Sequence, residues 1–248
     1  MTVIITTDRF CPEHTMEGNK LDLARDGFLR VQENVDDIKD KLGINYDIEI
    51  CPATKTVDAQ TINSLVPFGL KHIGENKMQE LESKYEQYSP ELSVDFIGTL
   101  QSNKVRSLVG KVRMIQSLST LSAAKEIQRV CQNRGCVQSV LIEINSACEE
   151  NKSGVLPEEF EEFAACVSEM DRIKLCGVMT VGAFVGDEAQ YAKYFTLARE
   201  LFEKNRRYFS GDIISMGMSD NYELAIKCGS TLIRPGRVIF GERNYNKS

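Results

Sequence analysis

Residues 139–181 read SVLIEINSACEENKSGVLPEEFEEFAACVSEMDRIKLCGVMTV, and their pattern decides the fold. An apolar run, SVLIEIN (139–145), precedes an amphipathic stretch, PEEFEEFAACVSEM (157–170), and a second apolar run follows, IKLCGVMTV (173–181). Short apolar runs are typical of strands buried on both faces, and the stretch between them has the spacing of a helix. The segment therefore predicts a strand, a helix and a second, parallel strand.

The same alternation extends through the chain in both directions. Helical patterns such as 121–132 and 187–207 separate further apolar runs of strand length, at 46–54, 70–74, 93–98, 113–118, 212–218 and 230–236. Eight strands followed by helices or helix-like turns predict an α/β protein with a single (β/α)8 TIM barrel. A doubly wound sheet is the alternative, but it usually carries a Gly-rich phosphate loop of a kind that this sequence lacks.

One more helix is predicted ahead of the barrel, at 17–42, where apolar residues recur every three or four positions until Gly43 ends the pattern. Because no linker or repeat interrupts the 248 residues, we expect one domain over 1–248, with this helix packed on a barrel at 46–243.

Composition excludes several classes of function. The 30 Lys and Arg against 36 Asp and Glu give a net charge of -6, which argues against nucleic-acid binding. No apolar run is long enough for a membrane span, and the first residues lack the pattern of a secretory signal. The eight cysteines form no C-x-x-C pair, so we expect no metal site and a cytoplasmic protein with reduced thiols.

Candidate site residues lie where the strands end, because TIM barrels place their active sites at the C-terminal ends of the strands. Lys55 follows the first strand, where its amine could enter a partly dry pocket and attack a carbonyl to form a Schiff base, or could simply lie on the surface. The Gly- and Ser-rich loop 215–219 and the Gly236-Arg237 pair follow the last two strands, where barrels often bind phosphate. Together they suggest pyridoxal phosphate (PLP) or a sugar phosphate.

Arg234 lies on the otherwise apolar last strand, where a permanent charge is costly unless it has a partner. Against a pyridine nitrogen, it would keep that nitrogen unprotonated. The alternative is an ion pair at the rim with Glu75 or Asp220. His72 likewise could touch the pocket or be an ordinary barrel histidine.

Five strings, ATKT (53–56), HIGENKMQE (72–80), DFIGTLQSNK (95–104), SMGMSDNYELAI (215–226) and IRPGRVIFG (233–241), resemble the pyridoxal-phosphate homeostasis protein family. That family is similar to the barrel domain of alanine racemase, a fold-type III PLP-binding barrel. The resemblance runs from about residue 46 to 243, with the motifs in the family order.

The resemblance implies PLP as the cofactor, with Lys55 as its Schiff-base lysine and Arg234 facing the pyridine nitrogen. It also implies a role near the cofactor for Lys152, as a second amine or an anion contact. Further cofactor-binding residues are implied at the phosphate, Ser215, Ser219, Gly236 and Arg237, and around the ring, Asn76 and Asn145. Three positions depart from the family pattern: Asp95 replaces a frequent His, Asn221 a frequent Asp, and Arg237 a small hydroxyl residue.

Three functions compete. The first is a PLP-binding protein with no committed reaction, which holds the cofactor for intracellular homeostasis and delivers it to apo PLP-dependent enzymes. The second is a weak amino-acid racemase, for which Lys55 would be the catalytic residue. It is disfavoured because the chain ends seven residues after Gly241, without the C-terminal domain that gives alanine racemases their second acid/base group. The third is a Schiff-base aldolase acting on a sugar phosphate. We expect a monomer with neither nucleic-acid nor membrane partners.

Overall fold

The computed structural model describes residues 12–149, 151–182 and 187–242. Eight parallel strands form one sheet in the order β1-β8-β7-β6-β5-β4-β3-β2. Its two ends meet, because Ala53 after β1 forms a parallel bridge with Gly74 of β2. The predicted barrel is therefore confirmed, with strands β1 (Glu49–Ile50), β2 (His72–Glu75), β3 (Ser93–Phe96), β4 (Met114–Leu118), β5 (Gln138–Glu143), β6 (Ile173–Met179), β7 (Ile213–Ser215) and β8 (Leu232–Ile233).

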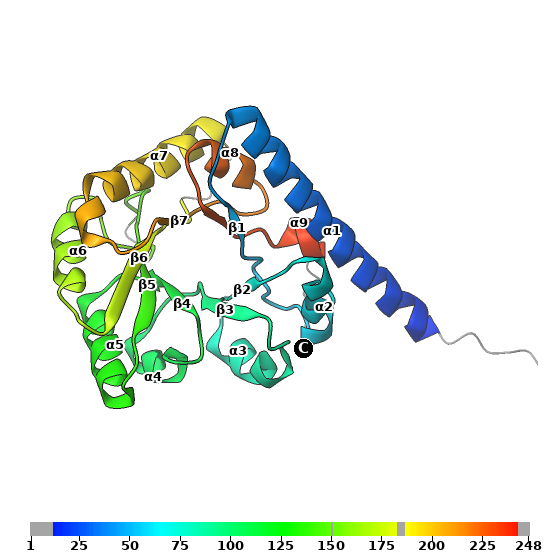
Figure 1. Ribbon diagram of the computed structural model, residues 1–248, viewed down its shortest axis with the longest axis horizontal. Helices are drawn as coiled ribbons and strands as arrows, with labels where there is room; N and C mark the ends of the chain where they lie inside the picture. Colours follow the sequence, from blue (N-terminus) through cyan, green and yellow to red (C-terminus); the bar gives the residue numbers. More distant parts are fainter. Residues whose placement is uncertain (1–11, 150, 183–186, 243–248) are drawn as a thin grey trace, which may run out of the picture.

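Helices surround the ring of strands (Figure 1). The larger part of the core fills the layer between strands and helices, and a smaller cluster comes from the strands and Cys51 alone. The helices of this outer layer are α2 (Ala59–Asn63), α3 (Met78–Lys84), α4 (Val105–Leu108), α5 (Leu121–Arg134), α6 (Phe160–Ser168), α7 (Glu188–Lys204), α8 (Tyr222–Lys227) and α9 (Arg237–Phe240).

The N-terminal helix α1 (Pro12–Leu42) begins earlier than the predicted residue 17. Proline suits the first turn of a helix, whose N–H groups have no partner within the helix. Gly43, with φ of 65°, ends it as predicted. The apolar face of α1 packs along α8 and α9, and its N-terminal end extends beyond the barrel (Figure 1). The residues of that face are Ala24, Phe28, Val31, Val35 and Ile38, all buried.

The regular strands are shorter than the apolar runs that predicted them. The first run, 46–54, contains only two residues of regular strand. The residues that follow them in the run are still hydrogen-bonded to the sheet: Cys51 N–H donates to Ile233 O (2.9 Å), and Ala53 N–H donates to Pro235 O (2.8 Å). The chain after β1 is thus held against β8. Within the described ranges, no helix has both the length and the apolar composition to cross a bilayer.

Candidate functional site

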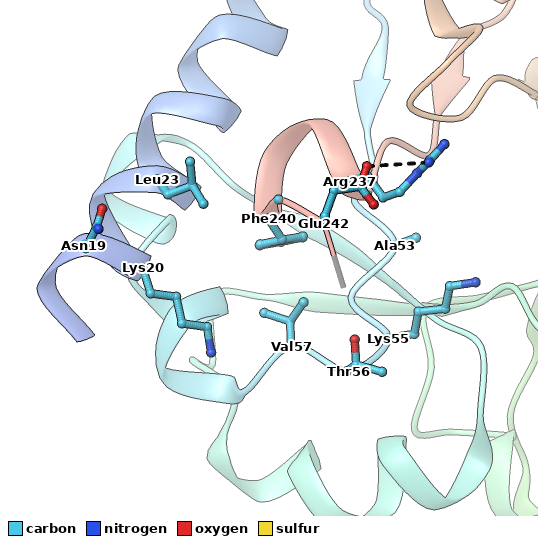
Figure 2. A pocket seen from close by; sticks show the side chains of 12 residues that line it. Asn19, Lys20, Leu23, Ala53, Lys55, Thr56, Val57, Arg237, Phe240 and Glu242 are labelled. Carbon is cyan, nitrogen blue, oxygen red and sulfur yellow. Dashed lines mark ion pairs between the residues drawn. The ribbon is translucent and has the colours of Figure 1, made fainter. Parts of the chain in front are cut away.

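Lys55 lies in the loop after β1, at the barrel end that carries the C-terminal ends of the strands. The preceding residue, Thr54, donates its N–H to Gly74 O (3.0 Å), which fixes the loop beside β2. The half-buried Lys55 lines a cavity of about 520 Å³ whose wall also contains Gly236 and Arg237 (Figure 2). The structure therefore brings three of the predicted site residues together in one cavity.

The turn that presents Lys55 is unusual. Thr56 is β-branched and has φ of 66°, in the left-handed region that such residues rarely occupy. A backbone of this kind costs on the order of 1–3 kcal/mol and persists where its surroundings fix it. Here Thr56 N–H donates to Glu80 Oε2 (2.8 Å), and Val57 N–H donates to Thr54 O (3.1 Å). These contacts determine where the Lys55 side chain leaves the backbone.

The buried carboxylate of Glu75 supports the same turn through hydrogen bonds. Glu75 is fully buried, and its Oε1 accepts hydrogen bonds from Thr54 Oγ1 (2.6 Å), Lys84 Nζ (2.6 Å) and Tyr88 OH (2.7 Å). Lys84 also donates to the carbonyls of Thr54 and Val57, each at 3.2 Å. Sequence reasoning missed Lys84, although its four-residue spacing from Glu80 was a signal for an ion pair.

The loops after β7 and β8 are bonded to each other. Ser219 Oγ accepts from the N–H groups of Gly236 (2.9 Å) and Val238 (3.4 Å), and Arg234 N–H donates to Gly217 O (2.8 Å). Ser219 thus ties the Gly-rich loop to the wall of the Lys55 cavity. The two loops form a single unit, and the chain before the lysine is bonded to it, because Ala53 N–H donates to Pro235 O (2.8 Å).

Two of the departures from the family pattern stabilise this unit. Arg237 makes an ion pair with Asp220. It also lies 3.7 Å from Glu242 Oε1 (Figure 2). Asn221 Oδ1 accepts from Met218 N–H (2.8 Å), which closes the loop that contains Asp220. Arg237 is partly exposed at the cavity wall, so it could exchange its carboxylate partners for a bound anion.

Ser215 and Arg234 lie inside the barrel rather than on its rim. Arg234 is buried and donates to Ser215 Oγ through Nη1 and to Thr180 O through Nη2 (2.9 Å). Its pKa is lowered by burial to about 10. The rim ion pair considered as an alternative does not form, because Glu75 is paired with Lys84 and Asp220 with Arg237. The Ser215 hydroxyl, which we expect at the phosphate, is bonded to Arg234.

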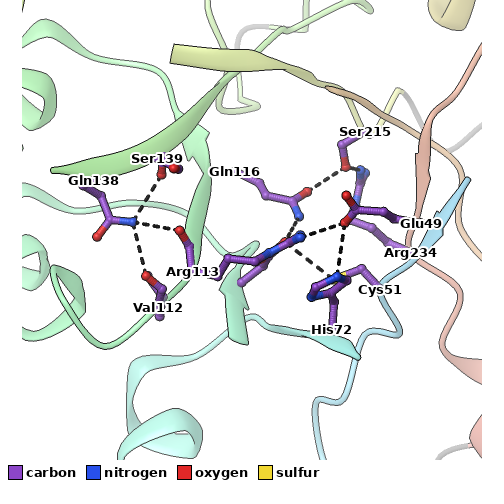
Figure 3. A network of polar contacts seen from close by, with 11 residues as sticks. Glu49, Cys51, His72, Val112, Arg113, Gln116, Gln138, Ser139, Ser215 and Arg234 are labelled. Atoms are coloured by element: carbon purple, nitrogen blue, oxygen red, sulfur yellow. Dashed lines mark hydrogen bonds and ion pairs between the residues drawn. The ribbon is translucent and has the colours of Figure 1, made fainter. Parts of the chain in front are cut away.

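A chain of polar contacts leads from Ser215 down through the barrel (Figure 3). Ser215 Oγ donates to Gln116 Oε1 (2.6 Å), and Gln116 Nε2 donates to Asp95 Oδ2 (2.6 Å). Asp95 accepts two bonds from Arg113, at 2.7 and 2.8 Å, and Arg113 Nη1 donates to Glu49 Oε2 (2.8 Å). Burial alone would lower the pKa of Arg113, but its bonds to Asp95 raise it. The fully buried Asp that replaces the family's His is therefore neutralised by a partly buried arginine.

His72 lies at the far end of this chain. It begins β2, at the opposite end of that strand from Lys55, and its Nε2 is 3.8 Å from Glu49 Oε2. Burial, together with the nearby charge of Arg113, lowers the pKa of His72. It is thus the ordinary barrel histidine of the two alternatives.

The remaining predicted residues line a second cavity, of about 480 Å³. Asn76, Asn145 and Lys152 contribute to its wall. The Asn145 side chain donates to Glu149 O (2.8 Å), and Lys152 Nζ lies 3.1 Å from Glu149 Oε2 and 3.3 Å from Gly182 O. Asn145 therefore shapes the loop after β5, while Lys152 is held at the rim of the cavity.

The two cavities open at the same end of the barrel. Met218 lines the second, and the adjacent Ser219 is bonded to Gly236 of the first. The first combines a primary amine and a guanidinium, and Gly236 in its wall is bonded to the loop after β7. This donor set fits a ligand that carries both an aldehyde and a phosphate.

Comparison with known proteins gives consistent results. The family model described as "Alanine racemase, N-terminal domain" matches residues 29–244. The pyridoxal phosphate homeostasis protein of Aquifex aeolicus is 40% identical over 196 residues, which are 78% of this chain and 86% of that protein.

Solved structures extend the similarity to the fold. An unknown protein from Bifidobacterium adolescentis superposes with a TM-score of 0.84 at 29% identity, covering 95% of this chain and 98% of its own. PipY of Synechococcus elongatus, solved with PLP bound, has a TM-score of 0.71 at 24% identity, covering 83% and 99%.

Proposed function

This chain belongs to the pyridoxal phosphate homeostasis protein family, and on that premise we propose that it binds pyridoxal 5'-phosphate and serves the homeostasis of that cofactor. It would hold PLP at Lys55 and deliver it to apo PLP-dependent enzymes in the cytoplasm, acting as a monomer. When bound, PLP supplies an aldehyde that condenses with a primary amine.

The observation that carries this proposal is the cavity that Lys55 lines together with Gly236 and Arg237. The Lys55 amine would bind the aldehyde covalently, and the phosphate would lie against Ser219, Gly236 and Arg237. Helix α1 contributes Leu23 to the same wall, so part of the cavity is screened from solvent. The unusual turn at Thr56 supports the role of Lys55, because strained backbone often marks a functional residue.

The remaining predicted residues take supporting roles in this proposal. Arg234 would face the pyridine nitrogen, and Asn76 and Asn145 would lie around the ring. Ser215, whose hydroxyl accepts a bond from Arg234, would position that arginine and contribute with Ser219 to the phosphate site. An arginine at the nitrogen weakens the ring as an electron sink, which favours holding the cofactor over carbanion chemistry.

A racemase remains the second candidate. It needs two acid/base groups on opposite faces of the reacting carbon, of which Lys55 could serve one. The name shared by the relatives favours the homeostasis function.

Delivery can be tested by mixing the PLP-loaded protein with an excess of an apo-aminotransferase and following the activity of the aminotransferase. We expect activation, together with loss of the visible absorption of the loaded protein. Lys55→Ala should carry no cofactor to deliver, and Lys77→Ala, which changes an exposed lysine outside the cavity, should behave as the wild type. A loaded protein that keeps its PLP for hours beside the apo-enzyme would contradict delivery.

A further inference from the structure

Two cysteines lie side by side where α5 ends. Cys131 is in the last turn of α5, and Cys136 follows the helix, two residues before β5 begins. Between them Gly135, with φ of 63°, takes the left-handed conformation that ends many helices. Gly135 N–H donates to Gln132 O (3.3 Å) and Cys136 N–H donates to Cys131 O (3.1 Å), the two hydrogen bonds of a Schellman motif. In this motif the side chains at the positions of Cys131 and Cys136 commonly contact each other.

The two thiols differ in their access to solvent. Cys131 is fully buried, whereas Cys136 is partly exposed. Burial raises the pKa of Cys131, and a hydrogen bond with the Cys136 thiol raises it further, while the nearby Arg134 and Arg172 partly oppose both effects. The side-chain contact expected from the backbone is therefore made by the two thiols. Because a thiolate with access to solvent is the form that attacks an oxidant, Cys136 is the thiol that reacts first.

Neighbouring contacts fix the chain on both sides of the pair. Arg134 Nη1 donates to Val109 O (2.5 Å) and its Nη2 donates to Arg106 O (3.0 Å), which ties the end of α5 to α4. Gln138 N–H, at the start of β5, donates to Arg172 O (3.1 Å), just before β6. A disulfide requires its two cysteines to be held close together, and here the backbone holds them so in the reduced protein.

We propose that Cys131 and Cys136 form a reversible disulfide on reaction with hydrogen peroxide, which joins the end of α5 covalently to the chain that leads into β5. The Cys136 sulfur attacks the peroxide, the O–O bond breaks, and Cys136 becomes a sulfenic acid while one water leaves. The Cys131 sulfur then attacks the Cys136 sulfur. The S–S bond forms, and the sulfenic hydroxyl leaves as a second water with the proton of the Cys131 thiol. Two thiols are oxidised and one peroxide is reduced, and a free thiol reverses the reaction by disulfide exchange.

The pair is remote from the proposed cofactor site. Cys136 precedes β5, at the end of the barrel where the strands begin, whereas Lys55 lies at the end where they finish. Disulfides in reducing compartments are usually transient and respond to oxidants, and an exposed thiol beside a buried one suits that behaviour. The inference therefore goes beyond the proposed function and does not depend on it.

The test uses the reduced, full-length protein, which is treated with hydrogen peroxide, alkylated with N-ethylmaleimide in urea and digested with trypsin. Arg134 lies between the two cysteines, so trypsin places them in separate peptides, 130–134 and 135–152. We expect mass spectrometry to find these peptides joined, and dithiothreitol to separate them. Cys148 is in the second peptide as well, so Cys148→Ser is the matched control and should keep the link, whereas Cys136→Ser should lose it.

A further variant tests the order of the two steps. In Cys131→Ala, the sulfenic acid on Cys136 cannot go on to the disulfide and should be trapped by dimedone, whereas the wild type should give far less of this adduct. A link that persists in Cys136→Ser, or a wild type in which Cys131 stays reduced while Cys148 and Cys166 are oxidised, would overturn the inference. Absence of the dimedone adduct from Cys131→Ala would contradict Cys136 as the attacking thiol.

Discussion

At the scale of single residues, Lys55 depends on Glu75, a carboxylate one strand away. Glu75 and Lys84 hold both ends of the turn at Thr54 and Val57, and neither of them lines the Lys55 cavity. They are positioning residues, which act through the backbone that carries the lysine.

The Lys84 contacts predict a large effect on stability. Lys84→Met removes the cation beside the fully buried Glu75, so we expect a loss of about 3–5 kcal/mol in the free energy of unfolding, measured with urea. The matched control is Lys77→Met, which changes an exposed lysine 3.8 Å from Glu80 and should cost less than about 1 kcal/mol. Equal losses in the two variants would show that Lys84 does not support the turn.

Sequence reasoning placed some site residues better than others. Lys55, Gly236 and Arg237 were predicted from their positions after strand ends, and they do share a cavity. Ser215 is the last residue of β7 and points into the barrel, a direction that was not predicted, and its place at the phosphate stays a prediction. Successive strand residues face opposite sides, so a shift of one position changes the direction of the side chain, and the end of a strand is rarely known that well from sequence.

At the scale of elements, α1 packs against α9, whose first residue, Arg237, lines the Lys55 cavity. Gly27 of α1 allows the close approach, because a Cβ there would lie 2.5 Å from Ile239 O and 2.8 Å from Ile239 Cα. Helix α9 begins at Arg237, so the docking of α1 also positions the end of the cavity that we assign to phosphate.

Gly27→Ala therefore tests the packing of α1. Alanine favours an isolated helix by about 1 kcal/mol over glycine, but the clash with the α9 backbone should outweigh this and cost about 1–3 kcal/mol overall. The midpoint temperature of thermal unfolding and the affinity for PLP should both fall. Glu33→Ala, on the exposed side of α1, is the control and should change neither appreciably. A Gly27→Ala protein with unchanged stability and affinity would contradict this packing.

The sequence predicted that α1 exists and packs on the barrel, but not where it starts. Periodicity marks a helix where its apolar face is buried, at Phe28 and Val35 for example, whereas the first turns of α1 extend beyond the barrel and carry no such signal. The strands are shorter than predicted for a related reason: the apolar runs continue beyond the last residues that pair regularly with a neighbouring strand.

At the scale of the whole molecule, the barrel interior is polar along a line from Arg234 to Glu49. Every member has a partner, which is the condition for a buried polar chain to be tolerated. Sequence alone showed Arg234 as a costly charge but could not identify its partners Ser215 and Thr180, which lie 19 and 54 positions away in the sequence.

The cysteines report on the integrity of this fold. Cys51 and Cys131 are fully buried, and burial raises the pKa of each, to about 12 for Cys131, whereas Cys148 and Cys166 are exposed. Only the thiolate reacts with alkylating reagents, so a short pulse of iodoacetamide should label Cys148 and Cys166 and spare Cys51 and Cys131 until the protein is unfolded. Mass spectrometry of the peptides reads the outcome. Equally rapid labelling of Cys51 would mean that the barrel interior is open.

The central claim is that Lys55 holds PLP, and the most direct measurement is to load the protein with PLP, reduce it with borohydride, digest it and locate the modified lysine by mass spectrometry. We predict a yellow protein whose modification is on the peptide that contains Lys55, and a Lys55→Ala variant that stays colourless. A protein that takes up no PLP, or one modified only at another lysine such as Lys152, would contradict the account. A colourless protein would mean that Lys55 is either an ordinary surface lysine or the Schiff-base lysine of an aldolase that acts on a sugar phosphate.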